Sequence, residues 1–175
     1  MSGYTARLPP GEKPLLMLGV SGVIALEDPV VPVRTVRLTA WGRWAREVAV
    51  PEVAPDRLAA LAELFQVVWV SEWGHVAHEA FREVLRLPRT PWPFLPAQFD
   101  KLPVIRDYAG GRPWAWVDEP VTDLAGATPS PAPGVVVRVD PGAGISEVDP
   151  SGLVREVLGP PGVSGRGSGA AGRRS

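Results

Sequence analysis

The sequence has no cysteine among its 175 residues. Disulfides, thiol catalysis and cysteine-based zinc sites are therefore excluded. It also lacks an excess of either charge, because 18 lysines and arginines stand against 19 aspartates and glutamates. A dedicated DNA-binding protein needs a strongly basic surface, so the composition does not favour that class.

Long apolar runs are missing as well. No uninterrupted run approaches the roughly 18 residues that a membrane-spanning helix needs. The first residues, MSGYTARLPPGEKP, lack the extended apolar region of a secretory signal peptide. We therefore expect a cytoplasmic protein with no membrane segment.

What is present is enough hydrophobic sequence (45%) for one globular domain. Glycine (19) and proline (21) are abundant, which is typical of long loops and a loose end. We expect an irregular lead-in at 1–13, one domain at 14–158 and a disordered glycine- and arginine-rich tail at 159–175. The tail has three arginines and no acid, which gives it a charge of +3. Because the whole chain has a net charge of −1, the rest of the chain has a net charge of −4.

The domain alternates between strand and helix patterns. Continuous apolar or β-branched runs predict strands, and spacings of three, four and seven apolar residues predict helices. The expected strands are 15–20, 67–70, 114–117 and 135–139, with a hairpin at 31–50 that turns at Gly42, and the expected helices begin at Pro55 and span 75–85, 102–109 and 153–158. The four prolines at 88–96 predict a loop. This order predicts an α/β, three-layer Rossmann-like sandwich with a mostly parallel sheet, a small β-hairpin flap and no large cap domain.

Polar residues follow the expected parallel strands, where ligands of such sheets bind. Gly19-Val20-Ser21-Gly22 follows the first strand and Ser71 follows the second. Lys101 precedes the short helix at 102–109, and Asp118-Glu119 ends the third strand.

In this order, the residues resemble the haloacid dehalogenase (HAD) superfamily of phosphohydrolases. The stretches that match are LGVSGVI (18–24), VWVSEW (68–73), KLPVIRDYAGGRPWAWVDE (101–119) and DPGAGI (140–145). The chain is most similar to a small capless bacterial branch, the HAD domain of Swiss-army-knife RNA-repair proteins. The resemblance implies a phosphate site at Ser71 and Lys101 and a Mg²⁺ site at Asp118 and Glu119.

The first motif departs from the family pattern. The resemblance implies a nucleophilic aspartate at position 19 and an acid/base aspartate two residues later, but the chain has Gly19 and Ser21 there. Gly19 has no side-chain oxygen to attack phosphorus or to bind Mg²⁺. The serine hydroxyl is a poor general acid near neutral pH. No catalytic residue of the family pair is intact, and Mg²⁺ is expected only if activity remains.

Ordinary structural roles compete with these assignments. Ser71 could be a helix N-cap, Lys101 a solvated lysine, and Asp118-Glu119 turn acids. A zinc site at His75 and His78 is not favoured without further ligands. Trp41, Trp44 and Trp73 are candidates for stacking on a ligand, because the hairpin and the second strand end approach the site, although core or loop packing is the more common role of tryptophan. Gly142-Ala143-Gly144 is an incomplete dinucleotide motif.

Three functions stay open from the sequence. The first is a non-catalytic HAD-like domain that binds a phosphorylated ligand or a protein partner. The second is an active Mg²⁺-dependent phosphohydrolase, with nucleic-acid ends among its substrates. The third is a structural relic that acts through its surface. The natural ligand and partner are not identified by the sequence.

Overall fold

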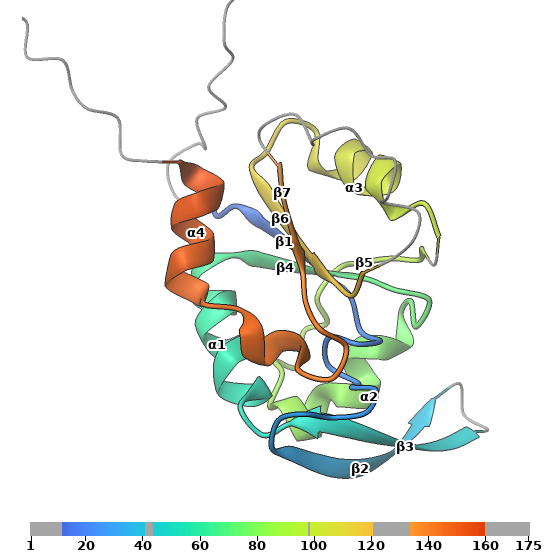
Figure 1. Ribbon diagram of the computed structural model, residues 1–175. Helices are drawn as coiled ribbons and strands as arrows, with labels where there is room; N and C mark the ends of the chain where they lie inside the picture. Colours follow the sequence, from blue (N-terminus) through green and yellow to red (C-terminus); the bar gives the residue numbers. More distant parts are fainter. Residues whose placement is uncertain (1–11, 41–43, 98, 121–133, 160–175) are drawn as a thin grey trace, which may run out of the picture.

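The structure is a computed structural model that describes residues 12–40, 44–97, 99–120 and 134–159. Nearly all of the expected lead-in and tail, together with Gly42 of the expected hairpin turn, lie outside these residues. The described part is an α/β sandwich with one parallel sheet and one separate hairpin (Figure 1).

The main sheet has five strands in the order β5-β4-β1-β6-β7. Its strands are β1 (Leu15–Leu18), β4 (Gln66–Val70), β5 (Phe94–Leu95), β6 (Trp114–Asp118) and β7 (Gly134–Arg138). All four pairings are parallel. The first strand lies in the middle, as predicted, because every residue of LLML is apolar and can be buried on both faces.

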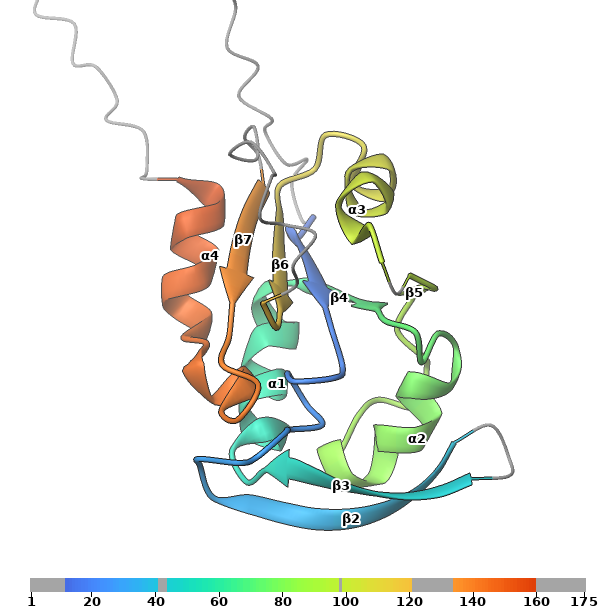
Figure 2. The same ribbon diagram turned by 45° about the vertical axis from the view of Figure 1, so that its right-hand side comes forward.

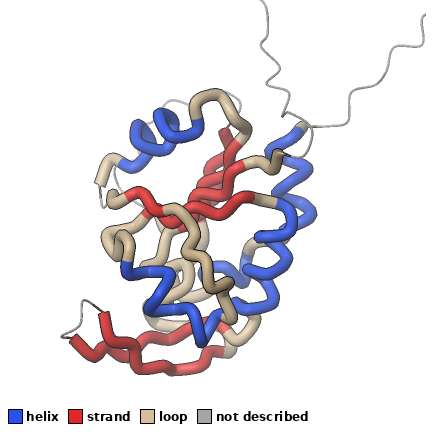
Figure 3. The backbone as a smooth tube through the Cα atoms, turned by 180° about the vertical axis from the view of Figure 1, so that it is seen from behind, coloured by secondary structure: helices blue, strands red, loops and turns tan. Residues whose placement is uncertain are grey.

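Helices cover both faces of this sheet, as Figures 2 and 3 show from two further sides. The helices are α1 (Ala54–Leu64), α2 (Val76–Leu85), α3 (Lys101–Ala109) and α4 (Pro150–Leu158). One face packs with α1, α2 and α4 around Leu16, Leu18 and Trp69. The opposite face packs with α3 around Met17 and Trp116. The predicted three-layer, Rossmann-like architecture is confirmed. No helix in the described ranges is long and apolar enough to cross a membrane.

The hairpin consists of β2 (Val33–Ala40) and β3 (Trp44–Pro51), paired antiparallel. Its buried residues, Leu38, Val48 and Val50, belong to the same core as α1 and α2. It lies across the end of the sheet at which the strands finish (Figures 1 and 2). The described residues contain no larger insertion at this end.

Three local features differ from the sequence predictions. The loop predicted at 88–96 contains β5, a two-residue edge strand whose Phe94 pairs with Trp69. Prolines on both sides did not prevent it, since an edge strand needs backbone pairing on one side only. Helix α4 begins at Pro150 rather than residue 153, because Asp149 caps it by accepting a hydrogen bond from the Gly152 N–H. A 3-10 helix at Gly144–Glu147 was not predicted.

Candidate functional site at the strand ends

The residues expected at the site follow three neighbouring strands. Leu18, the last residue of β1, lies beside Trp69 of β4 and Val117 of β6. The backbone N–H of Gly19 donates to the Val117 carbonyl at 3.0 Å. Gly19 and Ser71 directly follow β1 and β4, and Asp118 is the last residue of the adjacent β6, so all three lie at the same end of the sheet.

Lys101 and Asp118 form a buried ion pair at this end. Lys101 is the first residue of α3, and its Nζ lies 2.6 Å from Asp118 Oδ2. The two residues are 7% and 4% exposed. A buried charge is tolerated when it is paired and hydrogen-bonded. The pair therefore joins α3 to the end of β6.

The Asp118 carboxylate has further hydrogen-bond donors within the chain. The indole Nε1 of Trp116 donates to Oδ2 at 3.1 Å, and the Glu119 backbone N–H donates to Oδ1 at 2.9 Å. Both oxygens of Asp118 are thus engaged by protein groups. Lys101 likewise has its charge neutralised by a protein carboxylate.

Gly19 leaves the space that Asp118 occupies. A Cβ added at position 19 would lie 2.6 Å from Asp118 Oδ1 and 2.7 Å from its Cγ. Real Cβ atoms do not approach other atoms this closely, so any side chain at 19 requires Asp118 to move. An aspartate at position 19, the nucleophile position of the family pattern, would overlap the Asp118 carboxylate in its observed place.

Ser21 and Ser71 share one carboxylate, which the sequence analysis did not single out. Ser21 Oγ donates to Glu72 Oε1 at 2.8 Å, and Ser71 Oγ donates to Glu72 Oε2 at 3.1 Å. The Ser71 hydroxyl also accepts the Trp73 backbone N–H at 3.2 Å. Ser71 thus stabilises the turn after β4 and is not the N-cap of α2, which is His75. Glu72 could have been considered from its place directly after Ser71.

The site is rich in negative charge. The pKa of Glu119 is raised above its ordinary value of 4.5, first by burial and then by the carboxylates of Glu27, Asp118 and Glu72, while Lys101 acts in the opposite direction. Glu27 was also missed by the sequence analysis, because it lies on the loop between β1 and the hairpin, eight residues beyond Gly19. These surrounding carboxylates disfavour a phosphate dianion at this end of the sheet.

The donor set does not fit Mg²⁺. Position 19 supplies no side-chain oxygen, and both Asp118 oxygens accept hydrogen bonds from protein groups. No group of three or more histidines, aspartates or glutamates in the described ranges is arranged to hold a metal ion. We therefore assign no metal-dependent step to these residues.

The two histidines have different surroundings. His78 is 2% exposed, and its Nδ1 accepts from the Trp69 indole at 3.4 Å and the Trp92 backbone N–H at 3.2 Å. Because Nδ1 faces two N–H donors, the ring proton is on Nε2, which donates to the Pro88 carbonyl at 2.7 Å. His78 connects α2 to β4 and the following loop, and His75 is exposed.

The tryptophans singled out in the sequence give one clear result. Trp73 is 2% exposed and packs against Phe81 with ring centroids 5.3 Å apart. It is a core residue and offers no surface for stacking. Trp41 lies outside the described residues.

Comparison with known proteins gives no relative to guide the assignment. No family model, curated protein or solved structure matches this chain. The HAD resemblance stays a prediction from the ordered strand-end residues.

Proposed function

We propose that this protein is a HAD-like domain without phosphohydrolase activity, which binds a protein partner through its surface in the cytoplasm. The observation that supports this most is the Lys101–Asp118 ion pair, buried at the strand ends with its N···O distance of 2.6 Å. The lysine that the resemblance assigns to phosphate is paired within the chain. The acid that it assigns to Mg²⁺ fills the space beside Gly19.

This geometry favours a protein partner over a phosphorylated ligand. A phosphate would have to separate Lys101 from Asp118 and leave a carboxylate buried without its cation, which costs several kcal/mol. It would also approach the carboxylates of Glu72 and Glu119. Surface binding requires neither change.

One contact favours a catalytic alternative. The Ser21 hydroxyl donates to Glu72, so a candidate nucleophile has a hydrogen-bonded carboxylate as its base. Phosphoryl transfer also needs positive charge on the phosphoryl oxygens. The nearby lysine is neutralised by Asp118, and this makes the catalytic alternative the weaker one.

The test measures hydrolysis of an aryl phosphate by the wild type with and without Mg²⁺. A Ser21→Ala variant serves as the matched comparison. We expect both proteins to show only background turnover. Metal-dependent turnover by the wild type would contradict the proposal, and its loss in Ser21→Ala would identify a serine nucleophile.

A further inference from the structure

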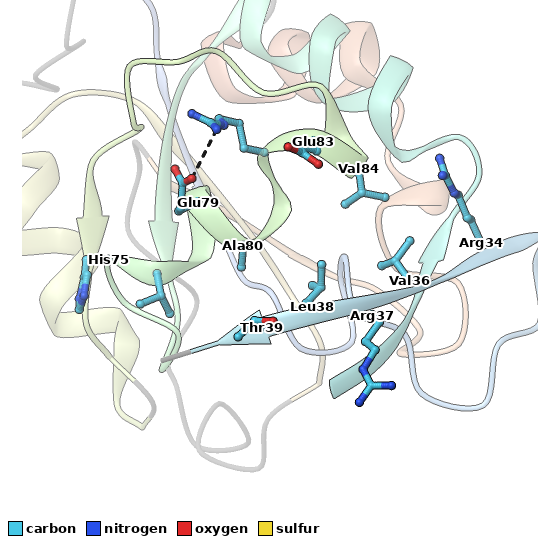
Figure 4. A pocket seen from close by; sticks show the side chains of 12 residues that line it. Arg34, Val36, Arg37, Leu38, Thr39, His75, Glu79, Ala80, Glu83 and Val84 are labelled. Atoms are coloured by element: carbon cyan, nitrogen blue, oxygen red, sulfur yellow. Dashed lines mark ion pairs between the residues drawn. The ribbon is translucent and has the colours of Figure 1, made fainter. Parts of the chain in front are cut away.

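A groove lies between the hairpin and α2, and none of its lining residues belongs to the strand-end site. Its volume is about 920 Å³, and Figure 4 shows it close by. Val36 and Leu38 of β2 project towards Ala80 and Val84 of α2, so its centre is apolar. Its charged border comes from both elements and consists of Arg34, Arg37, Glu79, Arg82 and Glu83.

Strand β2 has an open edge. The Glu52 N–H donates to the Pro32 carbonyl, and the register places residues 32 and 52 opposite each other. Hydrogen-bonded pairs alternate along an antiparallel ladder, so Thr35, Arg37 and Thr39 direct their N–H and C=O groups away from β3. These groups form no hydrogen bond with any other described residue.

The other edge of the hairpin supports this orientation. The carbonyl of Ala49, which lies opposite Thr35, accepts the Leu26 N–H at 2.8 Å on the outer side of β3. Thr35 and Ala49 therefore both direct their backbone N–H and C=O groups away from the partner strand of the hairpin. Leu26 therefore pairs with the outer edge of β3 at this point, while no described residue pairs with the edge of β2.

The open edge lies along the groove. Consecutive residues from Val36 to Thr39 line it, although side chains alternate between the two faces of a strand. Arg37 and Thr39, whose backbone groups point away from β3, are thus among the residues that line the groove. Helix α2 forms the other wall, and it contacts β2 directly.

We propose that this groove binds an extended segment of a partner protein, which adds a third strand to the hairpin along β2. This inference rests on the proposed binding function and specifies its site. At a strand spacing of about 4.8 Å, a sheet thickness of about 10 Å and about 3.4 Å per residue, the groove volume holds about six extended residues. Backbone pairing at an open edge supplies affinity, and alternate side chains supply specificity.

Charge specifies the chemistry of the segment. Arg34 and Arg37 are exposed, and neither forms an ion pair with another described residue. On α2, Arg82 pairs with Glu79 at 3.4 Å and Glu83 forms no ion pair with another described residue, so the three arginines and two glutamates of the border have a net charge of +1. Arg37 lies on the face of β2 opposite to Val36 and Leu38, so a segment that matches the groove alternates apolar residues, facing Ala80 and Val84, with acidic residues beside Arg37.

Two other occupants fit less well. A second copy joined through β2 would bring the arginines of both strands onto one ribbon, and like charges on neighbouring strands repel. The chain's own 160–175 segment has three arginines and no acid, so it has the wrong charge. A peptide from a different protein is the occupant that the charges favour.

The experiment selects binders from a displayed library of random decapeptides against the full-length wild type. Selected peptides are synthesised, and their affinity is measured by fluorescence anisotropy. The decisive variant is Arg37→Pro, which removes one outward N–H without removing a bond to β3; proline is tolerated on such an edge. Its matched control is Glu47→Pro, because Glu47 lies opposite Arg37 and directs its N–H to the other edge.

We expect peptides with alternating apolar and acidic residues. Arg37→Pro should weaken their binding about tenfold or more, since a hydrogen bond and an ion pair are lost, and Glu47→Pro should leave it within about twofold. Arg37→Lys, which keeps the outward N–H and the charge, should bind like the wild type even if Arg37→Pro proves unstable. Failure to select any peptide, equal losses in the two proline variants, or a preference for basic peptides would overturn the inference. Self-association that depends on Arg37 would instead identify a second copy as occupant and would also overturn it. None of these results depends on aryl phosphate turnover, so the docking inference and the proposed absence of hydrolysis fail separately.

Discussion

Replacing Lys101 by methionine tests whether the strand-end pair is a structural element of the domain. The substitution keeps most of the apolar stem and removes the ammonium group. It leaves the Asp118 carboxylate 4% exposed, with the Trp116 and Glu119 N–H donors but without its cation. Breaking a buried pair in this way costs about 3–5 kcal/mol. For a domain of this size, each kcal/mol lowers the melting temperature by roughly 2–4 °C, so we expect a decrease of about 6–20 °C.

The chain offers a matched control for this prediction. Arg86 and Asp56 also approach to 2.6 Å, but their side chains are 68% and 88% exposed. Arg86→Met should therefore change the free energy of unfolding by at most about 1 kcal/mol. Urea unfolding monitored by tryptophan fluorescence gives both values. Equal losses in the two variants would refute the claim that the Lys101–Asp118 pair is buried and structural.

A second substitution separates loss of charge pairing from loss of packing. Adding Asp118→Asn to Lys101→Met removes the buried negative charge that the single variant leaves behind. We expect the double variant to recover a large part of the lost stability, because an uncompensated buried charge is costlier than a neutral polar group. A double variant that is less stable than Lys101→Met would show that the loss does not come from the unpaired carboxylate.

Further substitutions test the surroundings of this pair. Gly19→Ala should cost about 1–3 kcal/mol in urea unfolding, because its Cβ would lie 2.6 Å from Asp118 Oδ1, and an unchanged midpoint would contradict the close approach. Glu119→Gln should raise the stability of the protein at pH 7 and have little effect below pH 4.5. The folded-state pKa of Glu119 is raised, so ionisation of this carboxyl destabilises the folded protein as the pH rises through that pKa. A stability gain in the variant that grows on acidification would contradict this direction of the pKa change. His78→Phe should cost about 1–3 kcal/mol by leaving buried N–H groups without an acceptor, whereas the exposed His75→Phe should stay within about 0.5 kcal/mol; similar values for the two would exclude the assigned role of His78.

The fold was predictable from the sequence because its strands have simple patterns. Continuous apolar runs such as LLML can only be buried on both faces, and this places them in a covered parallel sheet. The two-residue strand β5 was not predictable, since nothing in a proline-rich run shows that two backbone groups will pair with Trp69. Helix α4 could have been extended to Pro150 from its Asp149 N-cap signal.

The candidate site was predictable in its composition and not in its contacts. Strand-end positions of Gly19, Ser71 and Asp118 follow from topology alone. Pairing of Lys101 with Asp118 depends on how α3 packs against β6, and the sequence pattern alone does not fix that packing. Glu72 was overlooked because a charged residue after a strand is usually solvated, and only the geometry shows it accepting from two hydroxyls.

The most direct test of the account observes the Lys101 ammonium itself. In a protein with ¹⁵N-labelled lysine, NMR of the side-chain Nζ resonances, assigned with Lys101→Met, is recorded during titration with inorganic phosphate in the presence of Mg²⁺. We expect a Lys101 ammonium signal that is protected from exchange with water and does not shift in millimolar phosphate. A shift of this signal that saturates with phosphate would show that Lys101 binds the anion. It would contradict the claim that the ion pair with Asp118 keeps Lys101 from binding phosphate.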